Sequence, residues 1–203
     1  MITINEHNPI VIDCDEVLLD LVHPWVDKLN ELYNKDYSYP DIIRYDINYF
    51  YGISIEDAMK VLYDTSFYVN VNPIKNAKEA IAVLSSNGLP IKIVTSTPMN
   101  AIGIKLNKLL FDLNVNKENV IFTYDKRPIS CSIMIDDNYD NLFHNKHADM
   151  KILFTKPWNT KETLINNMVS LSSWGSIIDW FLNEGLIKPN ETYHKFMQNA
   201  WSV

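Results

Sequence analysis

Five short apolar runs constrain the fold of this chain more than any other feature. They are PIVID (9–13), LPIKIVT (89–95), NVIFTY (119–124), SIMID (132–136) and MKILFT (150–155). Each run is rich in Ile or Val and lacks a clean alternation of apolar and polar residues, which is typical of strands buried on both faces of a parallel sheet. With 203 residues, 47% of them hydrophobic, the chain is long enough to bury such a sheet.

Helical patterns lie between these runs. One amphipathic pattern extends from Pro73 to Leu84, with proline at its start and Asn87-Gly88 after its end. Residues 99–113 and 174–183 are also predicted to be helical, and residues 188–203 are predicted to form one more helix or a loose end. Strands that alternate with helices predict an α/β fold with a doubly wound parallel, Rossmann-like sheet.

Residues 20–72 do not fit this alternation. They separate the first strand from the next strand-helix unit by far more than an ordinary crossover, and they are dense in Tyr, Phe and acidic residues. Their patterns predict helices over residues 18–33 and 54–63, with Gly52 between them. We therefore expect a core domain formed by residues 1–19 and 73–203, and a small helical cap domain inserted as residues 20–72.

Charge and composition exclude several classes of protein. The formal net charge of −7 argues against a protein that binds nucleic-acid polymers through a basic surface. The only cysteines, Cys14 and Cys131, are too few for a disulfide framework or a zinc site with paired CxxC motifs. The N-terminal segment shows no signal-peptide pattern, and no apolar run has the length of a membrane helix. A cytoplasmic protein without a membrane partner is expected.

Polar residues gather where the predicted strands end. In an open α/β sheet, ligands bind at the carboxyl ends of the strands, so these residues are expected to meet at one edge. One lysine lies in the loop before the SIMID strand. The complete set is Asp13, Asp15, Thr95, Ser96, Lys126, Asp136 and Asp137.

This set of side chains suits phosphoryl transfer through a covalent aspartyl-phosphate. Carboxylate oxygens bind Mg²⁺, which offsets the repulsion between an anionic nucleophile and an anionic ester. A carboxylate can attack phosphorus, and a second acid can move the proton. Taken alone, Asp13 and Asp15 would fit a solvated strand end equally well; the other polar clusters, in this order, favour the functional interpretation.

The order of the motifs resembles that of a known superfamily. DCDEV, VTS, DK and IDD resemble the four motifs of the haloacid dehalogenase-like phosphohydrolases. More narrowly, the chain resembles the 5'(3')-deoxyribonucleotidases, which carry a helical cap after the first motif. Supporting stretches are IIRYDINYFYGIS, GLPIKIVTSTP, TYDKRPISCSIMIDDNYDN and ILFTKPWN. The likeness extends from Pro9 to Asn159, with a weaker similarity at SSWGSIIDW.

The resemblance implies roles for the acidic residues. Asp13 would be the nucleophile, and Asp15 the general acid and base, with its backbone carbonyl also meeting Mg²⁺. Asp137 would bind the metal directly, and Asp136 would support it or bind through water. Asp13, Asp15, Asp136 and Asp137 thus make up the predicted Mg²⁺ site.

The resemblance also implies substrate-binding residues. Thr95 and Ser96 would bind the phosphate, and Lys126 would neutralise it. Leu21, at the start of the cap, occupies a position where the family often has an aromatic side chain against the base. Glu16 departs from the glycine that is more usual after the second acid, and it adds a charge near the site.

These expectations together predict a Mg²⁺-dependent phosphomonoesterase that acts on ribo- or deoxyribonucleoside monophosphates, with deoxyribonucleotides preferred. Alternatives are the same chemistry on another small phosphoester, or a non-catalytic nucleotide-binding protein on this fold. A haloacid dehalogenase proper is disfavoured because that reaction needs no metal carboxylates. A P-loop kinase is excluded because GxxxxGK[ST] is absent. The expected partner is a small nucleotide, and a homodimer is left open.

Other chemically suggestive residues have plainer interpretations. Lys105 and Lys108 are weaker candidates than Lys126 for neutralising phosphate. Cys14 is interpreted as a small buried residue that points away from the acids. His144 and His147 fit a solvated helix face. The tyrosines of the cap could stack on a base, but core packing within the cap is the favoured interpretation for Tyr45, Tyr49, Tyr51, Tyr63 and Tyr68. Thr95 and Ser96 could also cap the following helix.

Overall fold

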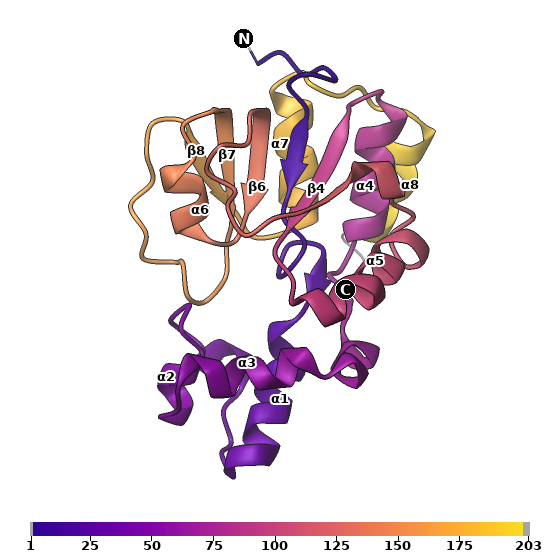
Figure 1. Cartoon of the computed structure of the whole chain (residues 1–203). Helices are drawn as coiled ribbons and strands as arrows, with labels where there is room; N and C mark the ends of the chain where they lie inside the picture. The colour runs from indigo at the N-terminus through magenta and orange to yellow at the C-terminus, as the bar shows by residue number, and fades with distance from the viewer. Residues whose placement is uncertain (1, 201–203) are drawn as a thin grey trace.

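The computed structural model describes residues 2–200, in which six strands form one parallel sheet (Figure 1). Each strand is paired in parallel with its neighbours. From one edge to the other, the strands are β5 (Val120–Phe122), β4 (Ile91–Thr95), β1 (Ile10–Ile12), β6 (Cys131–Asp136), β7 (Ala148–Phe154) and β8 (Met168–Leu171). The predicted α/β fold is confirmed, and the five predicted strands are present.

The strand β8 was not predicted from the sequence. It has only four residues, and it includes the polar Ser170. It lies at the edge of the sheet, where one side has no neighbouring strand, and of its four side chains only that of Met168 is buried. A strand of this kind lacks the apolar run by which the central strands were recognised.

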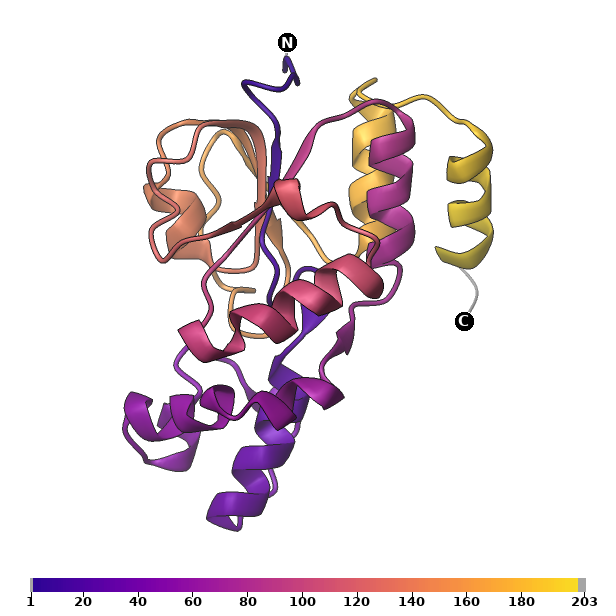
Figure 2. The ribbon, with the colours of Figure 1, turned by 45° about the vertical axis from the view of Figure 1, so that its right-hand side comes forward.

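The two faces of the sheet bury separate apolar clusters, because successive side chains on a strand point to opposite faces. Ile10 and Ile12 belong to one cluster and Val11 belongs to the other. The first face is covered by α4 (Ala77–Ser86), α5 (Ile102–Phe111) and α7 (Trp174–Asn183). The helix α6 (Tyr139–His144) covers the second face (Figure 2). This arrangement is a doubly wound sheet.

The helices of the core agree with the predictions, with shifts at their starts. The helix α7 has the predicted bounds. A short 3₁₀ turn, Met99–Ala101, precedes α5. The helix α8 (Glu191–Ala200) packs outside α4 and confirms the helical alternative for the tail, whose residues 201–203 lie outside the described part.

Two predicted helix starts were wrong. The structure places Pro73 in the two-residue strand β3 (Asn72–Pro73), which pairs antiparallel with β2 (Leu19–Asp20). The next residue, Ile74, donates its backbone N–H to the carbonyl of Leu18. The chain is therefore extended at Pro73, and α4 begins only at Ala77. For the same reason, the helix predicted from Leu18 begins at Val22.

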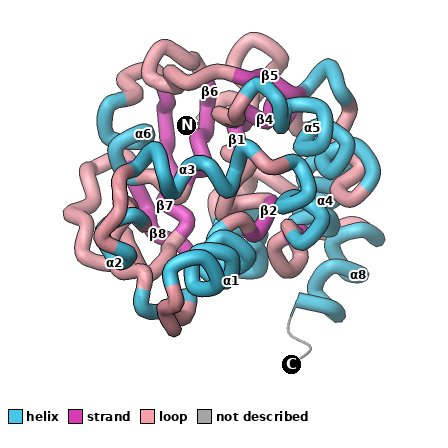
Figure 3. Tube along the Cα trace, turned by 60° about the horizontal axis from the view of Figure 1, so that its bottom comes forward, coloured by secondary structure: helices cyan, strands magenta, loops and turns pink. Residues whose placement is uncertain are grey.

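Residues 20–72 are mainly helical. Gly52 ends α2 with a positive φ of 64°, and the Ser54 hydroxyl caps α3 by accepting the N–H of Asp57. The elements are α1 (Val22–Tyr33), η1 (Tyr39–Asp41), α2 (Asn48–Tyr51), α3 (Ile55–Tyr63) and η2 (Thr65–Asn70). Figure 3 shows these helices in front of one end of the sheet.

We propose the division of the chain into a core (1–19 and 73–203) and a cap (20–72). Asp20 of β2 lies opposite Asn72 of β3, so the segments that leave and re-enter the core form one two-stranded connection. Inside the cap, the Trp25 indole N–H donates to the carbonyl of Ala58, which fixes α1 against α3. Within residues 2–200, no helix is both long enough and apolar enough to cross a membrane.

The position of β1 decides where the polar residues meet. It lies between β4 and β6, at the point where the chain changes direction of growth across the sheet. Ligands of such sheets bind outside the carboxyl ends of the strands at this switch point. In Figure 1 these ends face the cap, so the site is expected between the sheet and the cap helices.

Candidate active site

Asp13 lies at the centre of the strand-end cluster. It follows directly after β1, and its backbone N–H donates to the carbonyl of Ile135 on β6 at 2.8 Å. This bond keeps Asp13 in register with the end of β6. Its Oδ1 accepts the backbone N–H of Cys14 at 2.6 Å, so one oxygen of the carboxylate is fixed by its own loop.

Lys126 joins the two strand ends. Its ammonium lies 2.7 Å from Asp13 Oδ1 and 2.9 Å from Asp136 Oδ2, and the side chain is buried. Asn145 holds the loop, because its side-chain amide donates to the carbonyl of Lys126. Burial would lower the pKa of the Lys126 ammonium, but the two carboxylates outweigh this and raise it. Lys126 is therefore a cation fixed between the two acids.

Three carboxylates form a group suited to a divalent cation. Asp13, Asp136 and Asp137 each offer an oxygen, and these oxygens lie within 4.8 Å of one another. Burial raises the pKa of Asp13 to about 6 against the opposing effect of Lys126. Burial, together with Asp136 and Asp13, raises the pKa of Asp137 well above its usual value. A hard cation would relieve this repulsion, so the donor set fits Mg²⁺.

Asp136 and Asp137 have different surroundings. Asp136 is fully buried and accepts hydrogen bonds from Lys126, from the side-chain amide of Asn141 and from the backbone N–H of Asn138. Asp137 accepts one from the indole N–H of Trp158 at 3.0 Å. Asp136 is thus committed largely to protein donors, whereas Asp137 keeps more of its oxygen lone pairs for a ligand.

Asp15 lies apart from this group and pairs with Lys105. The Lys105 ammonium lies 2.7 Å from Asp15 Oδ2, 3.2 Å from the carbonyl of Ser96 and 3.4 Å from Thr95 Oγ1. Burial raises the pKa of Asp15, and Lys105 opposes this rise. The carboxylate of Asp15 is not part of the three-acid group in the described residues; a role for its backbone carbonyl stays a prediction.

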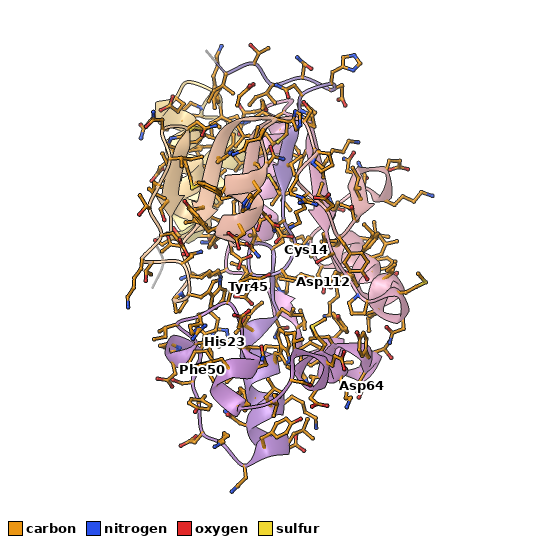
Figure 4. The ribbon with its side chains drawn as sticks, turned by 60° about the vertical axis from the view of Figure 1, so that its left-hand side comes forward. Cys14, His23, Tyr45, Phe50, Asp64 and Asp112 are labelled. Carbon is orange, nitrogen blue, oxygen red and sulfur yellow. The ribbon has the colours of Figure 1, made fainter. Side chains whose placement is uncertain are left out.

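A cavity of about 370 Å³ opens in front of these side chains, between the core and the cap. It is lined from the core by Asp13, Asp15, Ser96, Lys105, Lys126 and Asp137, and by Leu21 at the start of the cap. The rest of the cap contributes Arg44, Tyr45, Met59, Leu62, Tyr63 and Tyr68 among others. In Figure 4, Tyr45 lies between the cap and the end of the sheet near Cys14. The cavity therefore joins a charged floor to a largely apolar and aromatic roof.

Comparison with known proteins identifies the family. The model of the family described as "5' nucleotidase, deoxy (Pyrimidine), cytosolic type C protein" matches residues 7–184. The chain belongs to this family. The matched region includes the strands that carry the acids and the helices of residues 20–72. The predicted family and the predicted class of enzyme, a phosphoric monoester hydrolase, are confirmed.

Individual relatives agree with this assignment. A 5'(3')-deoxyribonucleotidase of Bacillus subtilis (strain 168) is 28% identical over 170 residues, which cover 83% of this chain and 95% of the relative. A 5'(3')-deoxyribonucleotidase of Clostridium acetobutylicum is 31% identical over 166 residues, which cover 80% of this chain and 88% of the relative. Among solved structures, a HAD family hydrolase of Deinococcus radiodurans R1 superposes with a TM-score of 0.60 at 14% identity. The superposition covers 90% of this chain and 98% of that structure. That structure supports the fold.

The two hydroxyl residues after β4 have different positions. Thr95 is fully buried, and its hydroxyl lies beside Lys105. Ser96 is exposed and lines the cavity. Neither side chain caps the following helix. Thr97 was not singled out from the sequence, yet it also lines the cavity. Ser96 and Thr97, but not Thr95, therefore line the cavity, and phosphate binding by Thr95 and Ser96 stays a prediction.

Glu16 has a structural explanation. Its φ of 58° lies in the left-handed region, which glycine adopts without the steric cost of a Cβ atom. Its Oε1 accepts the first backbone N–H groups of α1, from Leu21 at 2.8 Å and Val22 at 2.6 Å. Its Oε2 accepts the Tyr39 hydroxyl and lies 3.3 Å from the Lys156 ammonium. Glu16 therefore fixes the backbone where the chain enters the cap, and Lys156 supplies its counter-charge.

The plainer interpretations hold for several residues. Cys14 is fully buried, and burial followed by the nearby Asp15 raises the pKa of its thiol. His144 and His147 are exposed as predicted, but the two do not share a helix face, because α6 ends at His144. The cap tyrosines divide: Tyr51 packs inside the cap, where its hydroxyl donates to Asn30, whereas Tyr45, Tyr63 and Tyr68 line the cavity.

Lys105 is the functional candidate whose position the sequence analysis missed. It was ranked below Lys126 for binding phosphate, and the structure places it against Asp15. Ala101, Lys105 and Leu109 recur every four residues and are all buried. A lysine in the middle of a buried helical stripe needs a buried partner, and this was the signal available in the sequence.

Proposed function

We propose that this chain hydrolyses nucleoside monophosphates to nucleoside and phosphate, with deoxyribonucleotides preferred, through an aspartyl-phosphate on Asp13. The observation that carries the proposal is the Lys126 ammonium held between Asp13 and Asp136, beside Asp137, on the floor of a cavity roofed by the cap. Membership of the deoxynucleotidase family supports the substrate class. Residues 13, 15, 96, 126 and 137 all line that one cavity.

Asp13 would act as the nucleophile. Both hydrogen bonds that fix its carboxylate go to Oδ1, from Cys14 and Lys126. The other oxygen, Oδ2, would attack phosphorus, and the bond from phosphorus to the ester oxygen would break. Lys126 holds charge next to both the nucleophile and the phosphoryl group, where positioning and electrostatic stabilisation supply most of the catalysis. Ser96 would bind a phosphoryl oxygen.

Asp15 would move the proton. Its Oδ2 is fixed by Lys105, whereas its Oδ1 is buried and has no hydrogen-bond partner. In the first step, a protonated Asp15 would donate to the ester oxygen as the alcohol leaves. In the second step, the ionised Asp15 would take a proton from the water that attacks phosphorus. That attack would release phosphate and restore the carboxylate of Asp13.

Asp13, Asp136 and Asp137 would hold Mg²⁺, together with the backbone carbonyl of Asp15. The bound cation would offset the negative charge of the nucleophile and of the phosphate. The support for this part of the proposal is the convergence of three buried carboxylates around a single lysine. Removal of divalent cations by a chelator should abolish turnover, and addition of Mg²⁺ should restore it.

The substrate would be small. A cavity of about 370 Å³ falls within the usual range for small-molecule sites, and its roof offers aromatic and apolar contacts for a base. The net charge of −7 disfavours a nucleic-acid polymer. The proposal includes a cytoplasmic location and leaves a homodimer open, which size-exclusion chromatography with light scattering would test.

A substrate panel with Mg²⁺ tests the proposal. It compares dUMP, dTMP, the ribonucleotides, 3'-monophosphates and sugar phosphates, using the wild type, Asp13→Asn and the control Asp112→Asn. Asp112 follows α5 and pairs with Lys108 away from the cavity lining. We expect the highest kcat/KM with a deoxyribonucleotide, no turnover with Asp13→Asn, and unchanged turnover with the control. Turnover of sugar phosphates but of no nucleotide would contradict the substrate class.

A further inference from the structure

Tyr68 carries a buried hydroxyl that has no partner in the described structure. Its side chain is fully buried, and its hydroxyl is one of two buried side-chain polar atoms without a hydrogen bond in the described residues. The other atom is Asp15 Oδ1, and both residues line the same cavity. An unpaired buried polar group is costly and rare in native proteins, so two of them in one cavity point to a ligand.

The position of Tyr68 is fixed by packing. It lies on η2 (Thr65–Asn70), which packs against α3 within the cap and against α5 of the core. The ring of Phe67 meets its ring edge-on, with centroids 5.3 Å apart. Asp64, labelled in Figure 4, starts η2 by accepting the N–H of Ser66. Packing from both the cap and the core thus holds Tyr68 in the wall of the cavity, so little conformational freedom is lost on binding.

Two charged residues of the core, Asp15 and Lys105, line the same cavity as Tyr68. Besides burial, Lys105, Asp15 and Cys14 affect the pKa of the Tyr68 hydroxyl. Another cap tyrosine, Tyr45, is instead influenced by the acids of the Mg²⁺ group, Asp137 first and then Asp13. Tyr68, Asp15 and Lys105 line the same cavity, and Lys105 pairs with Asp15. Burial raises the pKa of Tyr68 to about 12, so its hydroxyl stays protonated and can donate.

We propose that the Tyr68 hydroxyl donates a hydrogen bond to a sugar oxygen of the leaving nucleoside, next to the ester that Asp15 protonates. Tyr68 is then a specificity-determining residue that selects leaving alcohols carrying an oxygen near the ester. This inference rests on the proposed function. A site built to bond such an oxygen discriminates against substrates that lack it, because its own polar group is then left unpaired.

The test compares dUMP with phenyl phosphate, an ester whose leaving group has no oxygen beside the ester bond. For Tyr68→Phe we expect kcat/KM for dUMP to fall about tenfold, as for loss of one buried hydrogen bond. The value for phenyl phosphate should change by less than about twofold, because that substrate never made the bond. The readout is the ratio of the two kcat/KM values.

A control separates recognition from packing. Tyr51 lies in the same cap, does not line the cavity, and its hydroxyl donates to Asn30 at 2.9 Å. Tyr51→Phe should therefore lower Tm and leave the ratio unchanged. Tyr68→Phe removes a hydroxyl that has no partner in the free protein, so its Tm should stay the same or rise.

The outcomes are distinguishable. If wild type hydrolyses both substrates and Tyr68→Phe leaves the ratio unchanged, the role of Tyr68 is contradicted and the proposed function stands. If Tyr68→Phe lowers kcat/KM equally for both substrates and also lowers Tm, the hydroxyl is structural and the inference is wrong. If wild type hydrolyses phenyl phosphate but neither dUMP nor any other nucleotide, the proposed function fails, and the inference that rests on it fails as well.

Discussion

The ammonium of Lys105 lies 2.7 Å from Asp15 Oδ2, and the lysine side chain is only 1% exposed. A helix of the core thus supplies the counter-charge for the acid that follows the first strand. Burial raises the pKa of Asp15 and Lys105 lowers it, and on balance this pKa is raised. This balance suits a group that must both give and take a proton.

Replacement of Lys105 tests this relationship. Lys105→Met leaves Asp15 beside a buried apolar chain without its cation, and loss of one partner of a buried pair destabilises by about 3–5 kcal/mol. We also expect kcat to fall at least about tenfold, because the carboxylate loses the group that orients it. Urea unfolding and steady-state kinetics measure the two effects.

The control for this variant is Lys108→Met. Lys108 lies on the same helix, and its partner Asp112 is 3.5 Å away and half-exposed. Exposed pairs contribute at most about 1 kcal/mol, so this variant should retain its stability and turnover. Equal effects of the two substitutions would show that Lys105 has no special relation to Asp15.

Glu16 makes a prediction about backbone strain. Glu16→Ala and Glu16→Gly both remove the carboxylate that binds Lys156 and the start of α1, and each should lose at least about 1.5 kcal/mol of stability. Glycine tolerates the φ of 58° without a Cβ penalty. Glu16→Gly should therefore be about 1 kcal/mol more stable than Glu16→Ala in urea unfolding. An alanine variant as stable as the glycine variant would mean that this φ carries no strain.

Trp158 makes a prediction about the metal. Its indole N–H donates to Asp137 Oδ2, and such supporting bonds orient ligands. Trp158→Phe should raise the Mg²⁺ concentration needed for half-maximal activity about tenfold or more. The matched control is Trp180→Phe. Trp180 lies on α7, is half-buried and does not line the cavity, so this variant should leave the concentration unchanged. An unchanged Mg²⁺ requirement in Trp158→Phe would exclude a supporting role for the indole.

The burial of the two cysteines leads to a prediction about the reactivity of their thiols. Both thiols are buried, and burial raises the pKa of Cys131 to about 12. A raised pKa means that the thiolate is scarce below this value, and thiolate is the reactive form. At pH 8 the folded protein should react slowly with a thiol reagent, and both cysteines should react quickly in denaturant. Rapid labelling of Cys131 in the folded state would contradict the buried position.

Five of the six strands of the parallel sheet could be predicted from the sequence, because burial on both faces leaves a plain signal. The five apolar runs became β1, β4, β5, β6 and β7. Since parallel strands bring their carboxyl ends to one edge, the grouping of Asp13, Lys126 and Asp136 also followed from chain order alone. The geometry between these side chains then required the structure.

Other features could not be predicted, for physical reasons. The strands β2 and β3 have two residues each, which is too short for any periodicity, so Pro73 was assigned to the start of a helix. The ion pair between Glu16 and Lys156 joins two positions that lie far apart in the chain. Such contacts depend on how distant side chains meet, and local sequence carries no signal of the partner.

The central claim is that Asp13 carries the phosphoryl group during turnover. The most direct measurement is an acid quench of wild type mixed with dUMP and Mg²⁺ at early times, followed by mass spectrometry of the peptide that contains Asp13. We predict a transient phosphoryl group on Asp13 that forms and decays within the turnover time and is absent in Asp13→Asn. Full turnover of dUMP by Asp13→Asn, or wild-type turnover without phosphorylated Asp13 at any time, would contradict the account.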